Sequence, residues 1–166
     1  MLEVKMYIDV LTTPERAFKS VADLMQRGHF FPDVVTNLRE LEPRREVETG
    51  AFLPGQRVAF ESYGQHFEHM IAQVHEWDDV EAHVVERVVR SPHGDVLEWR
   101  LAELTAGMIR IELTYRGNYG GFEKLTRTRA IKKFYEPTLE RLKIYLEDLN
   151  SFAGPRTFAP RTKAEG

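Results

Sequence analysis

The chain of 166 residues contains no cysteine. Disulfide bonds, zinc sites with thiolate ligands and catalysis by a cysteine nucleophile are therefore excluded. Long apolar runs are absent too, since no segment approaches the roughly 20 apolar residues of a membrane-spanning helix. The N-terminal sequence MLEVKMYIDV alternates apolar and polar residues and lacks the apolar core of a signal peptide. We therefore expect a cytoplasmic protein without a membrane span.

The sequence also lacks an excess of basic residues. Its formal net charge is -3, with 23 lysine and arginine residues against 26 aspartate and glutamate residues. A general nucleic-acid-binding protein usually carries a basic footprint, so we expect no nucleic-acid partner. A chain of this length can bury about 70% of its unfolded surface, which is enough for one core. We expect a single domain over residues 1–150.

The last long segment, residues 121–152, predicts an amphipathic helix. Its apolar residues recur at helical spacing: Leu125, Ile131, Phe134, Tyr135, Leu139, Leu142, Tyr145, Leu146 and Leu149. Pro137 lies inside this segment and predicts a kink, because it removes a backbone donor and crowds the preceding turn. Gly117, Gly120 and Gly121 offer a hinge before the helix. Residues 151–166 have little apolar periodicity, and we expect them to form a flexible tail.

The segment before this helix predicts strands and two short helices. Residues 2–10 alternate as a half-buried strand, and Thr13-Pro14-Glu15 has the residue types that begin a helix. Further strands are expected over residues 33–42, 57–63, 67–77, 80–89, 95–104 and 108–119. Their short connections require antiparallel neighbours, since a parallel crossover needs about a dozen residues. We predict an α+β helix-grip fold: a curved antiparallel sheet of about seven strands, two short helices after the first strand, and one long C-terminal helix over the concave face.

Four stretches carry a resemblance to a known superfamily. They are TTPERAFKSVADL followed by FFPDV, then Leu53-Pro54-Gly55-Gln56, then Val74-His75-Glu76-Trp77-Asp78, then residues 107–115 before the helix. In this order they resemble the START-like or SRPBCC superfamily of polyketide cyclase/dehydrase, lipid-transport and birch-pollen-allergen-like proteins. The resemblance covers residues 1 to about 150. It implies a pocket between sheet and helix for a lipid, a polyketide or a similar apolar molecule, and it implies no cofactor. It implies no single reaction, because fold does not fix function.

Ten residues are expected to contact such a ligand, because strand alternation or helix spacing turns them inward. They are Phe60, Met70, Val85, Trp99, Ile111, Leu113, Tyr115, Phe134, Tyr135 and Thr138. Aromatic rings with polar tips suit a pocket for an apolar body that carries one hydroxyl or carbonyl. The alternative for each aromatic residue is a filled core.

The inward face of the hairpin at residues 67–89 is ambiguous. A two-residue turn at Asp78-Asp79 would place Val74 opposite His83 and Met70 opposite Arg87. One face then carries Met70, Ala72, Val74, Val85 and Val89, with His83 and Arg87. The other face carries Ile71, Val84 and Val88, with His69, Gln73 and Glu86. We prefer the first face because its centre is more continuously apolar, and a slip of one residue would reverse the assignment.

On this choice His83, Tyr115 and Arg87 are the candidates for catalysis. An imidazole with a pKa of about 6.5 suits acid-base chemistry. An inward arginine suits a carboxylate or phenolate on the ligand. No metal site is predicted, since His66 and His69 are three apart on a strand and face opposite sides.

Three functional hypotheses follow. The first is a carrier or sensor that binds a hydrophobic or aromatic small molecule, such as a lipid or a polyketide-like compound, between sheet and helix. The second is a cyclase- or dehydratase-type enzyme that uses an inward histidine, tyrosine or arginine. The third is a protein-interaction module. The sequence leaves the choice between binding protein and enzyme open, and it leaves a homodimer open as well.

Overall fold

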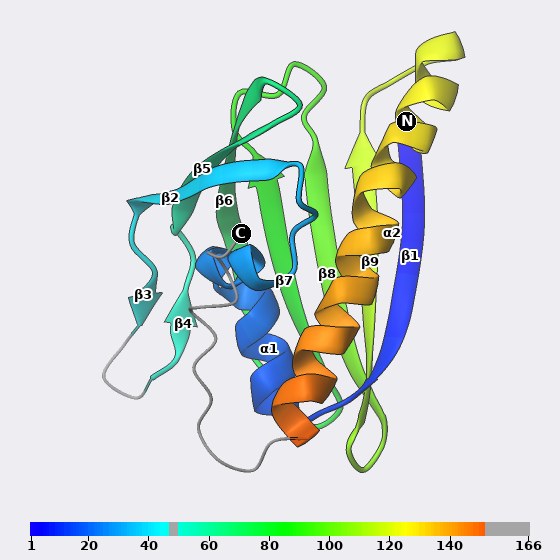
Figure 1. Cartoon of the computed structure of the whole chain (residues 1–166). Coiled ribbons are helices and arrows are strands. Elements are labelled where there is room, and N and C mark those ends of the chain that lie inside the picture. Colours follow the sequence, from blue (N-terminus) through cyan, green and yellow to red (C-terminus); the bar gives the residue numbers. More distant parts are fainter. Residues whose placement is uncertain (47–49, 152–166) are drawn as a thin grey trace.

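A computed structural model describes residues 1–46 and 50–151 of the chain. A seven-stranded antiparallel sheet has the strand order β1-β9-β8-β7-β6-β5-β2, and β3 and β4 form a separate two-stranded sheet. The helices α1 and α2 lie on the same face of the large sheet (Figure 1). This is the predicted α+β helix-grip arrangement. The predicted tail falls almost wholly on residues 152–166, which lie outside the described residues.

The elements follow one another in the predicted order, with the short strands β3 and β4 in addition. They are β1 (Leu2–Leu11), α1 (Pro14–Ala22), the 3-10 helix η1 (Leu24–His29), β2 (Val35–Glu42), β3 (Arg45–Glu46), β4 (Phe52–Leu53), β5 (Arg57–Ser62), β6 (Gln65–His75), β7 (Glu81–Val88), β8 (Val96–Thr105), β9 (Met108–Gly117) and α2 (Gly121–Ser151). None of the helices within the described ranges combines the length and the apolar composition that a membrane crossing requires.

The two short helices begin at side-chain caps. Thr13 Oγ1 accepts a hydrogen bond from the backbone N–H of Arg16 at 3.2 Å, and Pro14 occupies the first helical position of α1. Asp23 follows α1, and its Oδ1 accepts from the backbone N–H of Met25 at 3.1 Å at the start of η1. Asp23 thus fixes the turn between the two helices, and η1 carries the buried Arg27.

The core lies between the sheet and the helices. Among its fully buried strand residues are six from β8 and β9, where inward positions alternate along antiparallel neighbours: Leu97, Trp99, Leu101, Ile109, Ile111 and Leu113. From α2 the core receives Ile131, Tyr135, Leu139, Leu142 and Leu146, spaced as the sequence predicts. Pro137 lies inside this helix, and the kink there stays a prediction.

The hairpin of β6 and β7 differs from the prediction. β6 ends at His75 and β7 begins at Glu81, so the connection is longer than a two-residue turn. A register shift between Ile71 and Gln73 interrupts the alternation of β6. Met70 lies opposite Arg87, as expected, but beyond the shift Val74 lies opposite Val84 rather than His83.

Burial shows which face of the hairpin is inside. His69, Ile71, Val84 and Glu86 are buried, whereas Arg87 is exposed. Of the preferred face, Val74 packs against the core beyond the shift, but His83 and Arg87 lie on the outer side, so the assignment was wrong for them. The count of apolar residues favoured the wrong face, because the true inner face carries polar groups that pair with one another inside the protein.

Candidate ligand-binding site

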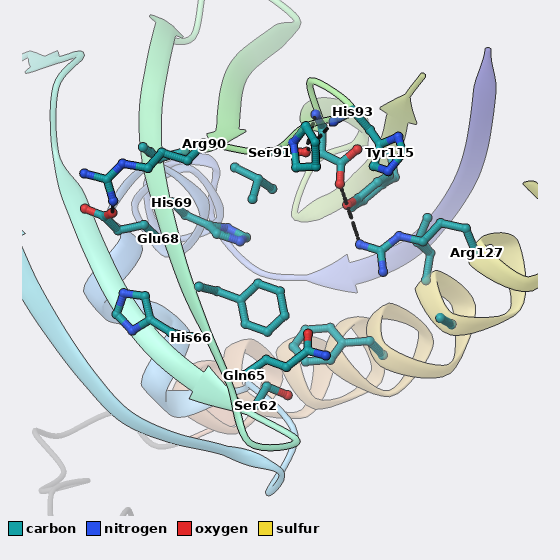
Figure 2. A pocket seen from close by; sticks show the side chains of 18 of the residues that line it. Ser62, Gln65, His66, Glu68, His69, Arg90, Ser91, His93, Tyr115 and Arg127 are labelled. Atoms are coloured by element: carbon teal, nitrogen blue, oxygen red, sulfur yellow. Dashed lines mark hydrogen bonds and ion pairs between the residues drawn. The ribbon is translucent and has the colours of Figure 1, made fainter. Parts of the chain in front are cut away.

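A cavity of about 880 Å³ lies between β5, β6, the loop after β7 and the first half of α2 (Figure 2). Its wall contains seven phenylalanine and tyrosine residues: Phe60, Tyr63, Phe67, Tyr115, Tyr119, Phe134 and Tyr135. Exposed residues, among them Tyr63 and Glu123, line it as well. The cavity thus joins the buried interior to the surface.

The hairpin of β5 and β6 forms one wall of this cavity. Its two-residue turn, Tyr63-Gly64, has φ angles of 52° and 75°. Positive φ at both central residues is the type I′ geometry that matches the twist of paired strands. The tight turn keeps Phe60 opposite Phe67, with ring centroids 5.6 Å apart.

Aromatic contacts join this hairpin to the helix. Phe31 lies 5.0 Å from Phe60 and 5.7 Å from Phe134, measured between ring centroids. Phe134 in turn lies 4.7 Å from Tyr135 at a steep angle. Edge-on and tilted pairs of this kind are favourable beyond their buried area. They make a wall suited to a flat apolar molecule.

A buried charged network lies at the inner side of the cavity. Glu86 on β7 is fully buried, and its Oε1 accepts hydrogen bonds from Arg27 Nη1 at 2.8 Å and Trp99 Nε1 at 3.0 Å. Its Oε2 pairs with Nδ1 of His69 on β6. The guanidinium of Arg27 also lies 4.7 Å from the ring centroid of Trp99 and donates to the carbonyl oxygen of Val21 at 2.8 Å.

These partners keep Glu86 ionised. Burial alone would raise its pKa, but the charge of Arg27 and the hydrogen bond from His69 outweigh burial and lower the pKa to about 2. Because an ionised carboxylate can only accept, Nδ1 of His69 donates to Glu86. Nε2 is then the ring nitrogen without a residue partner, and the ring points into the cavity (Figure 2).

A second polar cluster lies on the opposite wall, around Asp95. Oδ2 of this buried carboxylate accepts hydrogen bonds from the hydroxyls of Tyr115 at 2.6 Å and Tyr119 at 2.8 Å. Arg127 on α2 donates from Nη2 to Tyr115 Oη at 3.1 Å and lies 3.6 Å from Asp95 (Figure 2). The cluster ties the start of the long helix to β8 and β9.

Both tyrosines of this cluster hold their protons tightly. Burial and the hydrogen bond to Asp95 raise the pKa of Tyr115 far above 10.0 and that of Tyr119 to about 12. Each hydroxyl keeps its proton and donates a hydrogen bond to Asp95. Tyr115 was predicted as a candidate for catalysis, but its hydroxyl proton is already engaged in the hydrogen bond to Asp95.

The structure brings some of the predicted ligand residues together. Phe60, Tyr115, Phe134 and Tyr135 line the cavity. The other six do not line it. Trp99, Ile111 and Leu113 are fully buried in the core, and the Thr138 hydroxyl bonds back to the carbonyl oxygen of Phe134 at 2.7 Å. Met70 and Val85 are half-buried on the outer side of the hairpin.

The predicted catalytic residues His83 and Arg87 do not reach the cavity. His83 lies on the outer face, where Nε2 is 2.6 Å from Glu98 Oε2 and the ring stacks on His75. Arg87, opposite Met70, is exposed on the same face. Their placement inside was wrong, because the buried positions of β7 are Ala82, Val84 and Glu86, and strand alternation turns His83 and Arg87 to the other face.

Four of the polar residues that matter most were not proposed from sequence. His69 and Glu86 appeared together on the rejected face of the hairpin, and this coincidence of an imidazole and a carboxylate was the available signal. The helical spacing of apolar residues does not mark Arg127. Arg27 lies 59 positions from Glu86, and no local pattern connects the two. Within the described residues, no group of three or more histidine, cysteine, aspartate or glutamate side chains is placed to hold a metal ion.

No protein-family model and no curated protein matches the sequence. Solved structures match over most of the chain. The START superfamily protein of Mycobacterium smegmatis has 14% identity and a TM-score of 0.63, over 89% of this chain and 98% of that protein. The di-domain ARO/CYC protein BexL of the BE-7585A biosynthetic pathway has 15% identity and a TM-score of 0.67, over 92% of this chain and 48% of BexL.

A third similar structure is the Aha1 dimer from Colwellia psychrerythraea. It has 12% identity and a TM-score of 0.59, over 89% of this chain and 97% of that chain. At such identities the likeness concerns the fold alone. The chain has the START-like helix-grip fold.

Proposed function

We propose that the protein binds a flat, apolar small molecule, aromatic or conjugated, that carries a hydroxyl or carbonyl group. The observation that carries this proposal is the cavity of about 880 Å³, whose wall combines aromatic rings with buried polar groups. Ligand pockets of small molecules have this size and this mixture of apolar wall and few polar contacts. The ARO/CYC and START superfamily neighbours support the same reading.

The residues of the cavity wall indicate the chemistry of the ligand. Phe60, Phe67 and Phe134 offer ring faces and edges without hydrogen-bonding groups. His69 on one side and Arg127 on the other supply an acceptor and a cation. A purely aliphatic ligand would leave both polar groups unused, so a molecule with polar ends fits better.

A dye titration tests this proposal. Anilinonaphthalene sulfonate should bind the wild-type protein at one saturable site, and naphthol should displace it. Ala130 is an exposed residue of α2 that lines the cavity, so the larger side chain of Ala130→Trp should narrow the cavity and weaken dye binding at least tenfold. Lys132→Trp is the matched control, because this exposed residue of the same helix does not line the cavity. Equal dye binding by both variants would contradict the proposal.

A further inference from the structure

Two polar atoms of the inner cavity make no hydrogen bond with any residue in the described part of the chain. They are Nε2 of His69 and the hydroxyl oxygen of Tyr135, and neither is sealed from solvent. Their side chains are nevertheless buried, with 4% and 6% of their surfaces exposed, and both line the cavity. Both atoms are therefore open to the cavity and free to bond a molecule inside it.

The two groups are complementary. The neutral form of His69 offers a lone pair at Nε2, because its Nδ1 donates to Glu86. Tyr135 offers a proton, since burial and the negative charge of Glu86 raise the pKa of its hydroxyl well above 10.0. The charge of Glu86 thus acts on both groups from one buried position. A base and a neutral donor in one apolar cavity are the parts of a proton-transfer site.

We propose that His69 and Tyr135 form a proton-transfer site that enolises a carbonyl compound. His69 Nε2 is the base, and the Tyr135 hydroxyl donates a hydrogen bond to the carbonyl oxygen. The proposal rests on the proposed function, because the substrate is the flat apolar molecule of the cavity, here with a C–H bond next to a ketone. His69 and Tyr135 are the catalytic residues, since both would touch the reacting atoms.

The step balances without a co-reactant. Nε2 takes a proton from the carbon next to the carbonyl, and the electron pair of the broken C–H bond forms a C=C bond. The π pair of the carbonyl moves to its oxygen, and the resulting enolate accepts the hydrogen bond from Tyr135. Return of the proton to the oxygen or to another carbon gives the enol or an isomer and leaves His69 neutral again.

Glu86 and Arg27 act as positioning residues. Glu86 holds the proton of His69 on Nδ1 and stabilises the imidazolium that forms during the step. Arg27 keeps Glu86 ionised through its bond of 2.8 Å. Burying three ionisable side chains is costly, and well-packed apolar residues are often equally stable in such places. The proposed proton transfer explains why Arg27, Glu86 and His69 are buried beside the cavity.

Deuterium exchange tests the inference. The probe is β-tetralone, a bicyclic ketone, incubated with the protein in heavy water while proton NMR follows its α-hydrogen signal. His69→Asn keeps an N–H near the Nδ1 position and removes the base, and Tyr135→Phe removes the donor. The matched controls are His83→Asn, whose histidine pairs with Glu98 on the outer face, and Tyr7→Phe, which lies exposed on β1. Dye displacement measures in parallel whether β-tetralone occupies the cavity.

The wild-type protein should exchange the probe about 10³-fold faster than buffer. His69→Asn should lose about 10²-fold, as is typical of a general base, and Tyr135→Phe at least tenfold, with both controls unchanged. Exchange at the buffer rate despite dye displacement would overturn the inference and leave the proposed function intact. Failure of β-tetralone to displace the dye would contradict the proposed function and this inference with it.

A second measurement needs no variant. If His69→Asn does not fold, a long-range nitrogen-15 NMR spectrum of the wild-type protein reads the tautomer of His69 directly. A proton on Nδ1 with an unprotonated Nε2 supports the inference. A proton on Nε2 overturns it, because the cavity would then face a donor rather than a base.

Discussion

Arg27 and Glu86 lie 59 positions apart in the chain and form an ion pair of 2.8 Å that is sealed from solvent. Loss of one partner leaves the other charge buried without compensation. We therefore expect Arg27→Met to lower the free energy of unfolding by about 3 to 5 kcal/mol, measured by urea denaturation. Arg39→Met, which breaks the half-exposed pair with Glu61, should cost at most about 1 kcal/mol. Equal losses in the two variants would contradict the role given to burial.

Acid should lower the free energy of unfolding of the protein, because it protonates Glu86. Its folded pKa of about 2 lies below the ordinary 4.5, so the folded state favours the ionised form. The stability that it contributes is present above the ordinary pKa and is lost as the pH falls from about 5 toward 2. Glu86→Gln should flatten the pH dependence of the unfolding free energy in this window. Glu136→Gln, which changes an exposed residue, should follow the wild-type profile; a flattened profile there would argue against Glu86.

The Asp95 cluster should appear in an alkaline titration. The pKa of Tyr119 is raised to about 12, so its neutral form is favoured by folding. The stability that it contributes is complete below about pH 10 and is lost as the pH rises through about 12. Tyrosinate absorbance should show one late step that Tyr119→Phe removes. If that variant titrates like the wild type, Tyr119 is not held by Asp95.

Gly117 makes room for this cluster. A Cβ atom at this position would lie 2.4 Å from Asp95 Oδ1 and 2.5 Å from Tyr119 Cε2. Gly117→Ala should therefore displace both side chains and destabilise the protein by about 1 to 3 kcal/mol. Gly120→Ala is the matched control, since nothing lies within 4 Å of a Cβ atom there. Thermal unfolding of both variants measures the difference, and equal midpoints would show that the contact at Gly117 is not tight.

The predictable part of the fold is the part that local pattern determines. Thr13-Pro14 predicts the start of α1. The helical spacing from Ile131 to Leu146 predicts both that α2 forms and which of its faces is buried. The short connections gave the antiparallel order. These features depend on neighbours within a few residues, which a sequence displays directly.

The site was less predictable because it depends on a bulge and on distant partners. One extra residue in β6 near Ala72 moves His75 to the side of His83 and leaves His69 inside with Glu86. Apolar alternation alone favours the opposite face. The charge of Glu86 can be buried on the true inner face because Arg27 of η1 pairs with it in the folded protein.

An NMR titration with naphthol tests the central claim most directly, because it locates the ligand. On a nitrogen-15 and methyl-labelled sample, the account predicts saturable shifts concentrated at the cavity wall around Phe60, His69, Tyr115 and Tyr135, with the outer-face residue His83 unmoved. Ala130→Trp should abolish these shifts. Shifts scattered over the surface, centred on the outer face or persisting in Ala130→Trp would contradict the account.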